Sequence, residues 1–209
     1  MQVLSAKEVA EWFQGFENVE VESDHVHTDE DGLFFTHPES TCIILEYPVK
    51  LEQLPFFARL VATIGYEEQH FDGAMIWFHN WGVWNLFNEG IGYRIVERMN
   101  AGAGQPNSFE VSPGHRFRAD ELSDAIGMLM QPMIFAWDSY YLPIWSYGGC
   151  SEFFLHVSHD SIVNVVTRTK VFHDRVFQRL EELHFNPKTA NEERVKRFCH
   201  SRTASPLKS

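Results

Sequence analysis

The sequence predicts an α+β protein in which a mixed, largely antiparallel sheet is built from hairpins and about five helices pack on it. Apolar, strand-like runs occur in pairs, and segments with helical periodicity lie between the pairs. Strands and helices do not alternate regularly, as they do in doubly wound parallel sheets. Apolar residues make up 44% of the 209 residues and aromatic residues 14%, so the chain can form a substantial core.

The first elements are predicted from a capping box and a turn. Ser5 and Glu8 have the spacing of a capping box, which predicts a short amphipathic helix that ends at Gly15. Residues 33–36 and 41–47 are apolar and flank a turn-like segment that contains a proline, which predicts a hairpin.

The middle of the chain is predicted to contain two helices around an aromatic strand. Residues 51–64 have helical periodicity, with Pro55 near the start, where its missing N–H costs least. Residues 74–84 predict a buried strand followed by a turn or a second strand, and residues 89–99 a helix. Residues 101–115 are rich in Gly, Pro, Asn and Ser and predict a long loop.

The second half begins with a predicted helix over residues 119–130, which Pro132 is expected to stop. Two aromatic strands are expected over residues 133–137 and 140–145.

The last elements are a hairpin and two helices. Residues 152–158 and 162–167 predict the clearest hairpin in the chain, and residues 170–183 a helix. A second capping box at residues 189–192 is expected to open a short helix. We therefore predict one domain over residues 1–185, with a loop boundary near 101–115. Residues 186–209 are expected to form a short amphipathic helix and a polar tail.

The charge of the chain is concentrated in its first half. Residues 1–100 contain 17 Asp and Glu against 5 Lys and Arg, whereas residues 101–209 contain 12 of each. A one-sided acidic charge excludes nucleic acid and anionic membrane as partners and attracts a basic protein. The predicted binding residues lie in the acid-rich stretch of residues 17–31: Glu20, Glu22, Asp24, Asp29, Glu30 and Asp31.

Two alternatives to a partner-binding face stay open for these acids. Charge runs are commonly plain solvated surface. The segment from Lys188 onward carries six Lys or Arg against two Glu, so the acids can also pair with the chain's own basic end or with that of a second copy. The second case makes the protein a homo-oligomer.

Two aromatic stretches, 77–84 and 137–145, hold five of the six tryptophans. Core packing is one interpretation, and an aromatic-lined pocket is the other. The pocket candidates are Trp77, Trp81, Trp84, His115, Trp137, Asp138, Tyr140 and Tyr141. In an enzyme, His115, His156 or His159 would be the general base.

Other motifs are weaker. His25 and His27 would share one side of a strand and could bind a metal, but spacing fixes no third ligand. Residues 156–161 combine His, Asp and Ser, which a hairpin turn also explains. Cys150 follows two glycines and is interpreted as an incidental loop cysteine. We predict no cofactor and assign no metal site.

The three cysteines, Cys42, Cys150 and Cys199, do not form a disulfide framework or a paired metal motif. The first residues lack the pattern of a signal peptide, and no apolar run approaches the length of a bilayer span, so a cytosolic location is expected.

The function expected from these observations is binding of a basic protein without catalysis, as acidic inhibitor or immunity proteins do when they neutralise basic enzymes. The alternative is a small-molecule-binding protein or hydrolase-type enzyme that uses the aromatic pocket and a histidine base.

Overall fold

The structure is a computed structural model that describes residues 1–16, 19–21, 32–80, 86–105, 111–146 and 151–199. The described residues form six α-helices, one sheet of eight strands and a second sheet of two strands. Every strand pair in both sheets is antiparallel. The predicted α+β class is confirmed.

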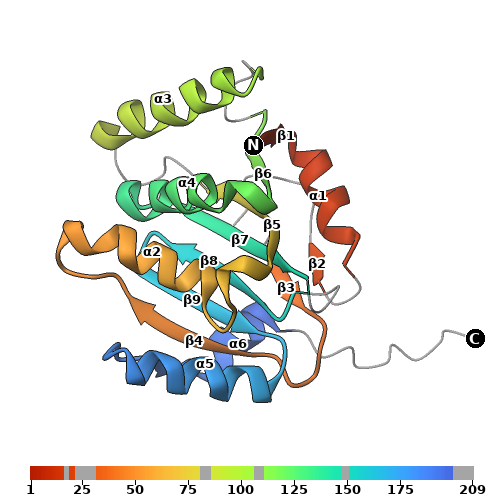
Figure 1. The fold of residues 1–209 in the computed structure, drawn as a ribbon, viewed down its shortest axis with the longest axis vertical. Coiled ribbons are helices and arrows are strands. Elements are labelled where there is room, and N and C mark those ends of the chain that lie inside the picture. The colour runs from red at the N-terminus through yellow and green to blue at the C-terminus, as the bar shows by residue number, and fades with distance from the viewer. Residues whose placement is uncertain (17–18, 22–31, 81–85, 106–110, 147–150, 200–209) are drawn as a thin grey trace, which may run out of the picture.

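The large sheet runs through the middle of the molecule (Figure 1). From one edge to the other its strands are β1 (Gln2–Leu4), β6 (Gly114–Arg118), β5 (Phe71–Asn80), β7 (Asp138–Trp145), β8 (Phe153–Ser158), β9 (Ile162–Thr167), β4 (Thr41–Glu46) and β10 (Lys188–Thr189). The small sheet pairs β2 (Val19–Val21) with β3 (Leu33–Phe35). The hairpin of β8 and β9 is confirmed, and Ser161 turns it with a φ of 62°.

Helices cover the two faces of the large sheet unequally. One face, here called the helical face, is covered by α2 (Leu54–Thr63), α4 (Leu122–Phe135) and α5 (Lys170–Glu182). The opposite face, here called the terminal face, is covered by α1 (Ala6–Gln14), α6 (Glu192–Phe198) and the small sheet. Helix α3 (Leu86–Gly102) lies outside α4 (Figure 1). Short 3₁₀ helices span Leu51–Gln53, Glu68–His70 and Ala119–Glu121.

Strand alternation sends successive side chains into separate cores on the two faces. On β5, Ile76 and Phe78 enter the core of the helical face, and Trp77 enters the core of the terminal face. On β8, Leu155 enters the core of the helical face and Phe154 the core of the terminal face. Because both faces are buried, these strands are apolar almost throughout.

The first helix forms as the sequence predicts. The Ser5 hydroxyl accepts a hydrogen bond from the backbone N–H of Glu8, and the Glu8 carboxylate accepts one from the backbone N–H of Ser5. Val9 and Phe13, four residues apart, are the buried side chains of α1. Gly15 is the C-cap.

The predicted end of the helix at Pro132 and the predicted strand over residues 133–137 are wrong. Pro132 lies inside α4, which continues to Phe135 and ends at Ala136 with a left-handed φ of 54°. Pro132 and Met133 are buried on the helix face that also carries Leu129. Burial of that continuous apolar stripe outweighs the backbone hydrogen bond that the proline removes.

The predicted hairpin of residues 33–36 and 41–47 is also wrong. Both segments form strands, but β3 pairs with β2, and β4 lies between β9 and β10 in the large sheet. Residues 36–40 carry the chain from the small sheet to the large one. Apolar alternation identifies a strand without identifying its partner.

The second predicted capping box is displaced. Asn191, not Thr189, caps α6, because its side chain accepts from the backbone N–H of Arg194. Thr189 instead pairs with Ile43 at the edge of the large sheet. Phe198, in the last turn of α6, is buried in the core of the terminal face.

Candidate functional site

The two aromatic stretches form neighbouring strands. Trp77 on β5 lies opposite Tyr140 on β7, and their rings stack with centroids 5.5 Å apart. Both rings are buried on the terminal face. Trp137 and Tyr141 belong to the core of the helical face, and the His115 ring packs against Phe78 on that face. The sheet therefore separates the described pocket candidates into two groups instead of bringing them together.

On the terminal face, Asp138 is the centre of a group of histidines. Its Oδ2 lies 2.9 Å from Nδ1 of His159, and its Oδ1 accepts the backbone N–H of His159 at 3.0 Å. Nε2 of His156 lies 3.8 Å from the same Oδ1. The His79 ring packs edge-on against Tyr140, 5.6 Å between centroids. We call Asp138, His79, His156 and His159 the histidine–aspartate cluster.

A line of polar contacts extends from this cluster across the sheet. Arg194 on α6 donates to Oδ1 of Asn164 at 3.2 Å, and Nδ2 of Asn164 lies 3.0 Å from Nδ1 of His156. Because arginine can only donate, the atom of Asn164 that faces Arg194 is the carbonyl oxygen. The amide nitrogen of Asn164 therefore donates to His156. The proton of neutral His156 is therefore on Nε2, which faces Asp138.

Burial keeps His156 neutral. Its side chain is almost completely buried, and burial is the main reason why its pKa lies well below the usual value. Nearby positive charge lowers this pKa further, from Arg197, His79, Arg194 and His159. A histidine in this state is a poor acceptor of a substrate proton at neutral pH.

The cluster is packed more like a structural network than like an open site. The Asp138 side chain is 11% exposed and the His159 side chain 32%, and His79 is buried. Phe198 covers His156 at 5.1 Å between centroids, and the Arg197 guanidinium lies over Phe198. The contacts join the start of β7, the β8–β9 turn and α6. Of the candidate bases, His159 alone combines a carboxylate partner with substantial exposure.

The acid-rich stretch is attached beside this cluster. Strands β2 and β3 are antiparallel and pair Val21 with Leu33, so the intervening residues leave and return to the fold at the same end of the small sheet. Gly32 lies directly against Tyr140, because a Cβ at Gly32 would be 2.8 Å from the Tyr140 hydroxyl. Glu20, on β2, is half-buried opposite Phe34.

Several predicted residues lie outside the part of the chain that the structure describes. They are Glu22, Asp24, Asp29, Glu30, Asp31, His25, His27, Trp81, Trp84 and Cys150. Among the residues that are described, no group of three or more His, Cys, Asp or Glu is placed to hold a metal ion.

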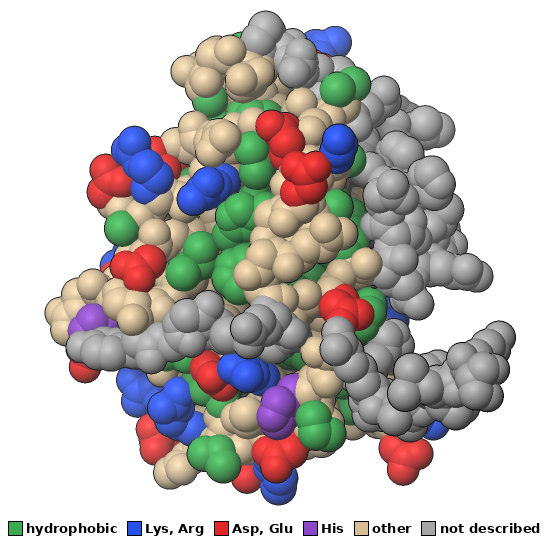
Figure 2. Space-filling model, turned by 90° about the vertical axis from the view of Figure 1, so that its right-hand side faces the viewer, with side chains coloured by type: hydrophobic (Ala, Val, Ile, Leu, Met, Phe, Trp, Pro, Cys, Tyr) green, Lys and Arg blue, Asp and Glu red, His purple; other side chains and the backbone are tan. Residues whose placement is uncertain are grey.

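The described surface is mixed in charge. Figure 2 shows acidic and basic side chains side by side on one face, with hydrophobic side chains between them. Basic residues of the second half pair with nearby acids, as Arg168 does with Glu152 and Arg179 with Glu182. Lys188 pairs with Glu46 of the first half.

The sequence did not single out His79, Asn164 or Arg194. Each lies on an element whose place in the fold depends on strand order, and that order brings them together. The sequence does contain one signal, the alternation of side chains along each strand. Asp138 and Tyr140, two residues apart, share one face of β7, and His156 lies on the same face of the neighbouring β8. The cross-strand register that pairs His156 with Asn164 comes from the structure.

No protein-family model, no curated protein and no solved structure matches this chain. Within the described part of the chain, no helix combines the length and apolar character that a bilayer crossing requires. Functional argument therefore depends on the chain's own residues.

Proposed function

We propose that the protein binds a basic protein partner through the acid-rich residues between β2 and β3 and does not catalyse a reaction. The observation that carries the proposal is the anchoring of this segment. Val21 and Leu33 pair at its ends, and Gly32 is held against the buried ring of Tyr140. Residues 22–31, half of them acidic, are thus connected at both ends to the small sheet of the terminal face.

The distribution of charge supports the same function. The chain has a formal net charge of −12, and its excess of acid lies in residues 1–100. Four basic side chains of the second half that the structure describes pair with acids of that half: Arg118, Arg168, Lys170 and Arg179. Concentrated negative charge attracts a positively charged surface and speeds its association.

The histidine–aspartate cluster fits this function as a support. Its members are mostly buried, and His156 is neutral and hydrogen-bonded. Tyr140, whose ring packs against His156 and His79, also contacts the end of the acid-rich segment at Gly32. The hydrogen bonds of Asp138 with His159 and of Asn164 with His156 stabilise the arrangement of these strands around Tyr140.

The test compares two variants with the same change in net charge. The segment variant carries Asp24→Asn, Asp29→Asn, Glu30→Gln and Asp31→Asn. The control variant carries Glu181→Gln, Glu182→Gln, Glu192→Gln and Glu193→Gln in and around α5 and α6. Association with immobilised poly-L-lysine is measured as salt is varied.

We expect the segment variant to associate about tenfold more slowly than the wild type at low salt, and the control variant to lose much less. Equal losses in the two variants would show that total charge, not the segment, drives binding, and would refute the proposal. Photo-crosslinking from residue 28 should then capture basic cellular proteins, and capture should fail in the segment variant.

A hydrolase-type enzyme is the second candidate, and the contact between Asp138 and His159 favours it. A carboxylate 2.9 Å from Nδ1 orients an imidazole so that its other nitrogen can act as a base. Turnover of nitrophenyl esters above that of free imidazole, lost in His159→Gln and kept in His37→Gln, would support it. Rates equal to free imidazole would reject this activity.

A further inference from the structure

Helices α3 and α4 are antiparallel and separate towards one end. Near the start of α3 they are tightly packed, since a Cβ at Gly92 would be 2.6 Å from the Phe135 ring. Towards the other end of α3 the two helices diverge (Figure 1), and a Cβ at Gly102 would have no atom within 4 Å. The space between the separated ends is a cavity of about 430 Å³ lined by Met1, Met99, Gly102, Ala103 and Asp124.

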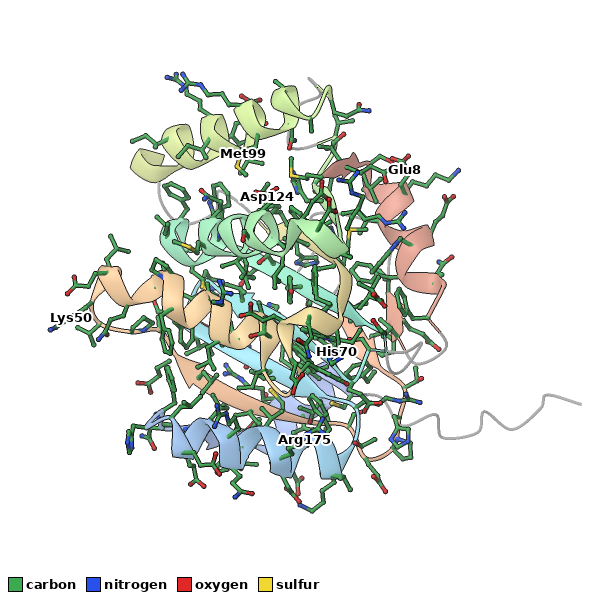
Figure 3. The ribbon with its side chains drawn as sticks, in the orientation of Figure 1. Glu8, Lys50, His70, Met99, Asp124 and Arg175 are labelled. Carbon is green, nitrogen blue, oxygen red and sulfur yellow. The ribbon has the colours of Figure 1, made fainter. Side chains whose placement is uncertain are left out.

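The two sides of the cavity differ in chemistry. Figure 3 shows Met99 on α3 and Asp124 on α4 facing each other across the space between the helices. Met99, Met1 and Ala103 supply apolar and thioether surface, and the N-terminal ammonium of Met1 is paired with Glu121. Thioethers make favourable contacts with aromatic rings. Asp124 supplies a carboxylate at the opposite wall.

Asp124 supplies the negative charge of the cavity that would attract a positive ligand. Among the residues that the structure describes, no Lys or Arg forms an ion pair with Asp124. The cavity lies between the C-terminal end of α3 and the N-terminal end of α4, where the two helix dipoles oppose each other, so the carboxylate of Asp124 is the source of its negative charge. Arg118, in a neighbouring hollow, is already paired with Asp120 and Glu121.

We propose that this cavity binds a small organic cation, an amine whose ammonium group pairs with Asp124 and whose aromatic or aliphatic body contacts Met99. The volume is within the range of small-molecule sites. A single carboxylate beside thioethers is a poor ligand set for a hard metal ion, which requires several oxygens, so the site selects an organic cation. The proposal does not depend on the binding of a protein partner.

The test uses phenethylammonium as the probe, with 2-phenylethanol and 3-phenylpropanoate as neutral and anionic analogues. The chain has six methionines, so methyl-¹³C methionine labelling gives few signals, and Met99→Leu identifies the signal of Met99. Spectra are recorded at about 0.15 M salt, where weak surface pairing is screened. The expected dissociation constant of phenethylammonium is about 1 mM, given its few non-hydrogen atoms.

Two pairs of comparisons decide the result. Asp124→Asn should weaken phenethylammonium about fivefold and leave 2-phenylethanol unchanged. Gly102→Phe should fill the cavity and abolish the saturable shift of the Met99 methyl. Gly90→Phe, on the same helix and also in open space, should leave the shift intact.

The proposal is overturned if phenethylammonium gives no saturable shift, if 3-phenylpropanoate binds as well, or if Asp124→Asn retains full affinity. It is also overturned if Gly102→Phe and Gly90→Phe behave alike while circular dichroism shows both to be folded.

Discussion

The pH dependence of stability follows from a buried histidine on β6. His115 is completely buried, and Nε2 of its ring lies 2.7 Å from Oδ1 of Asn100. Burial lowers the pKa of His115 to about 3. The unfolded chain takes up this proton near the ordinary pKa of 6.5. Between these two values the unfolded state binds more protons than the folded state.

Stability should therefore be fully present above pH 6.5 and decline as pH falls towards 3. For His115 alone, the two pKa values give a loss of about 2 kcal/mol between pH 7.5 and 5. In a chain of this size that loss corresponds to a lower melting temperature by about 4–8 °C. His156, whose pKa is also lowered by burial, acts in the same direction. The range stops at pH 5 because carboxylates begin to titrate below it.

The assay is urea unfolding, followed by tryptophan fluorescence at the two pH values. His115→Gln keeps a donor for Asn100 but removes the titrating group. Between pH 7.5 and 5 its free energy of unfolding should therefore fall by about 2 kcal/mol less than that of the wild type. His37→Gln, at a surface turn, should lose as much as the wild type. Equal losses in His115→Gln and the wild type would refute the reasoning. If His115→Gln does not fold, ring ¹⁵N shifts of the wild type must show neutral His115 at pH 5.

Further predictions concern local packing and hydrogen bonds, each measured by urea unfolding. Gly114→Ala should destabilise by about 3 kcal/mol, because its Cβ would be 2.1 Å from a Val9 methyl; Gly102→Ala, in open space, should be neutral or stabilising. Equal changes in the free energy of unfolding at Gly114 and Gly102 would contradict the close contact between Gly114 and Val9. Ser5→Ala should cost about 1 kcal/mol by removing the N-cap of α1. Asn164→Ala should cost about 1–3 kcal/mol because it leaves buried Nδ1 of His156 without its donor; no loss would mean that the contact contributes nothing.

Some of the fold could be predicted because its signals are local. The capping box of α1 lies within four residues, and the β8–β9 hairpin closes over a three-residue turn. The apolar stripe of α5 is readable at helical spacing, and the helix spans Lys170–Glu182, close to the predicted 170–183. Each signal concerns backbone groups that are neighbours in the chain, so no tertiary contact is needed to identify it.

Other features depend on contacts between distant segments. Pro132 looks like a helix terminator, but burial of α4 against the sheet keeps it helical. The apolar character of residues 41–46 predicts a strand whichever partner it has. Its pairing with β9 instead of β3 depends on where those strands lie in the folded protein. Local patterns of hydrophobicity carry no information about such partners.

The sequence by itself determined the class of the fold, the concentration of acid in its first half, and the aromatic content of two strands, because composition and periodicity are properties of the chain alone. Tertiary structure decided which side chains meet. The alternation of β5 and β7 sends Trp77 and Tyr140 to one face and Ile76 and Tyr141 to the other. Strand order then places His156 between Asp138 and Asn164. That grouping depends on cross-strand register, which is fixed by the burial of both faces at once.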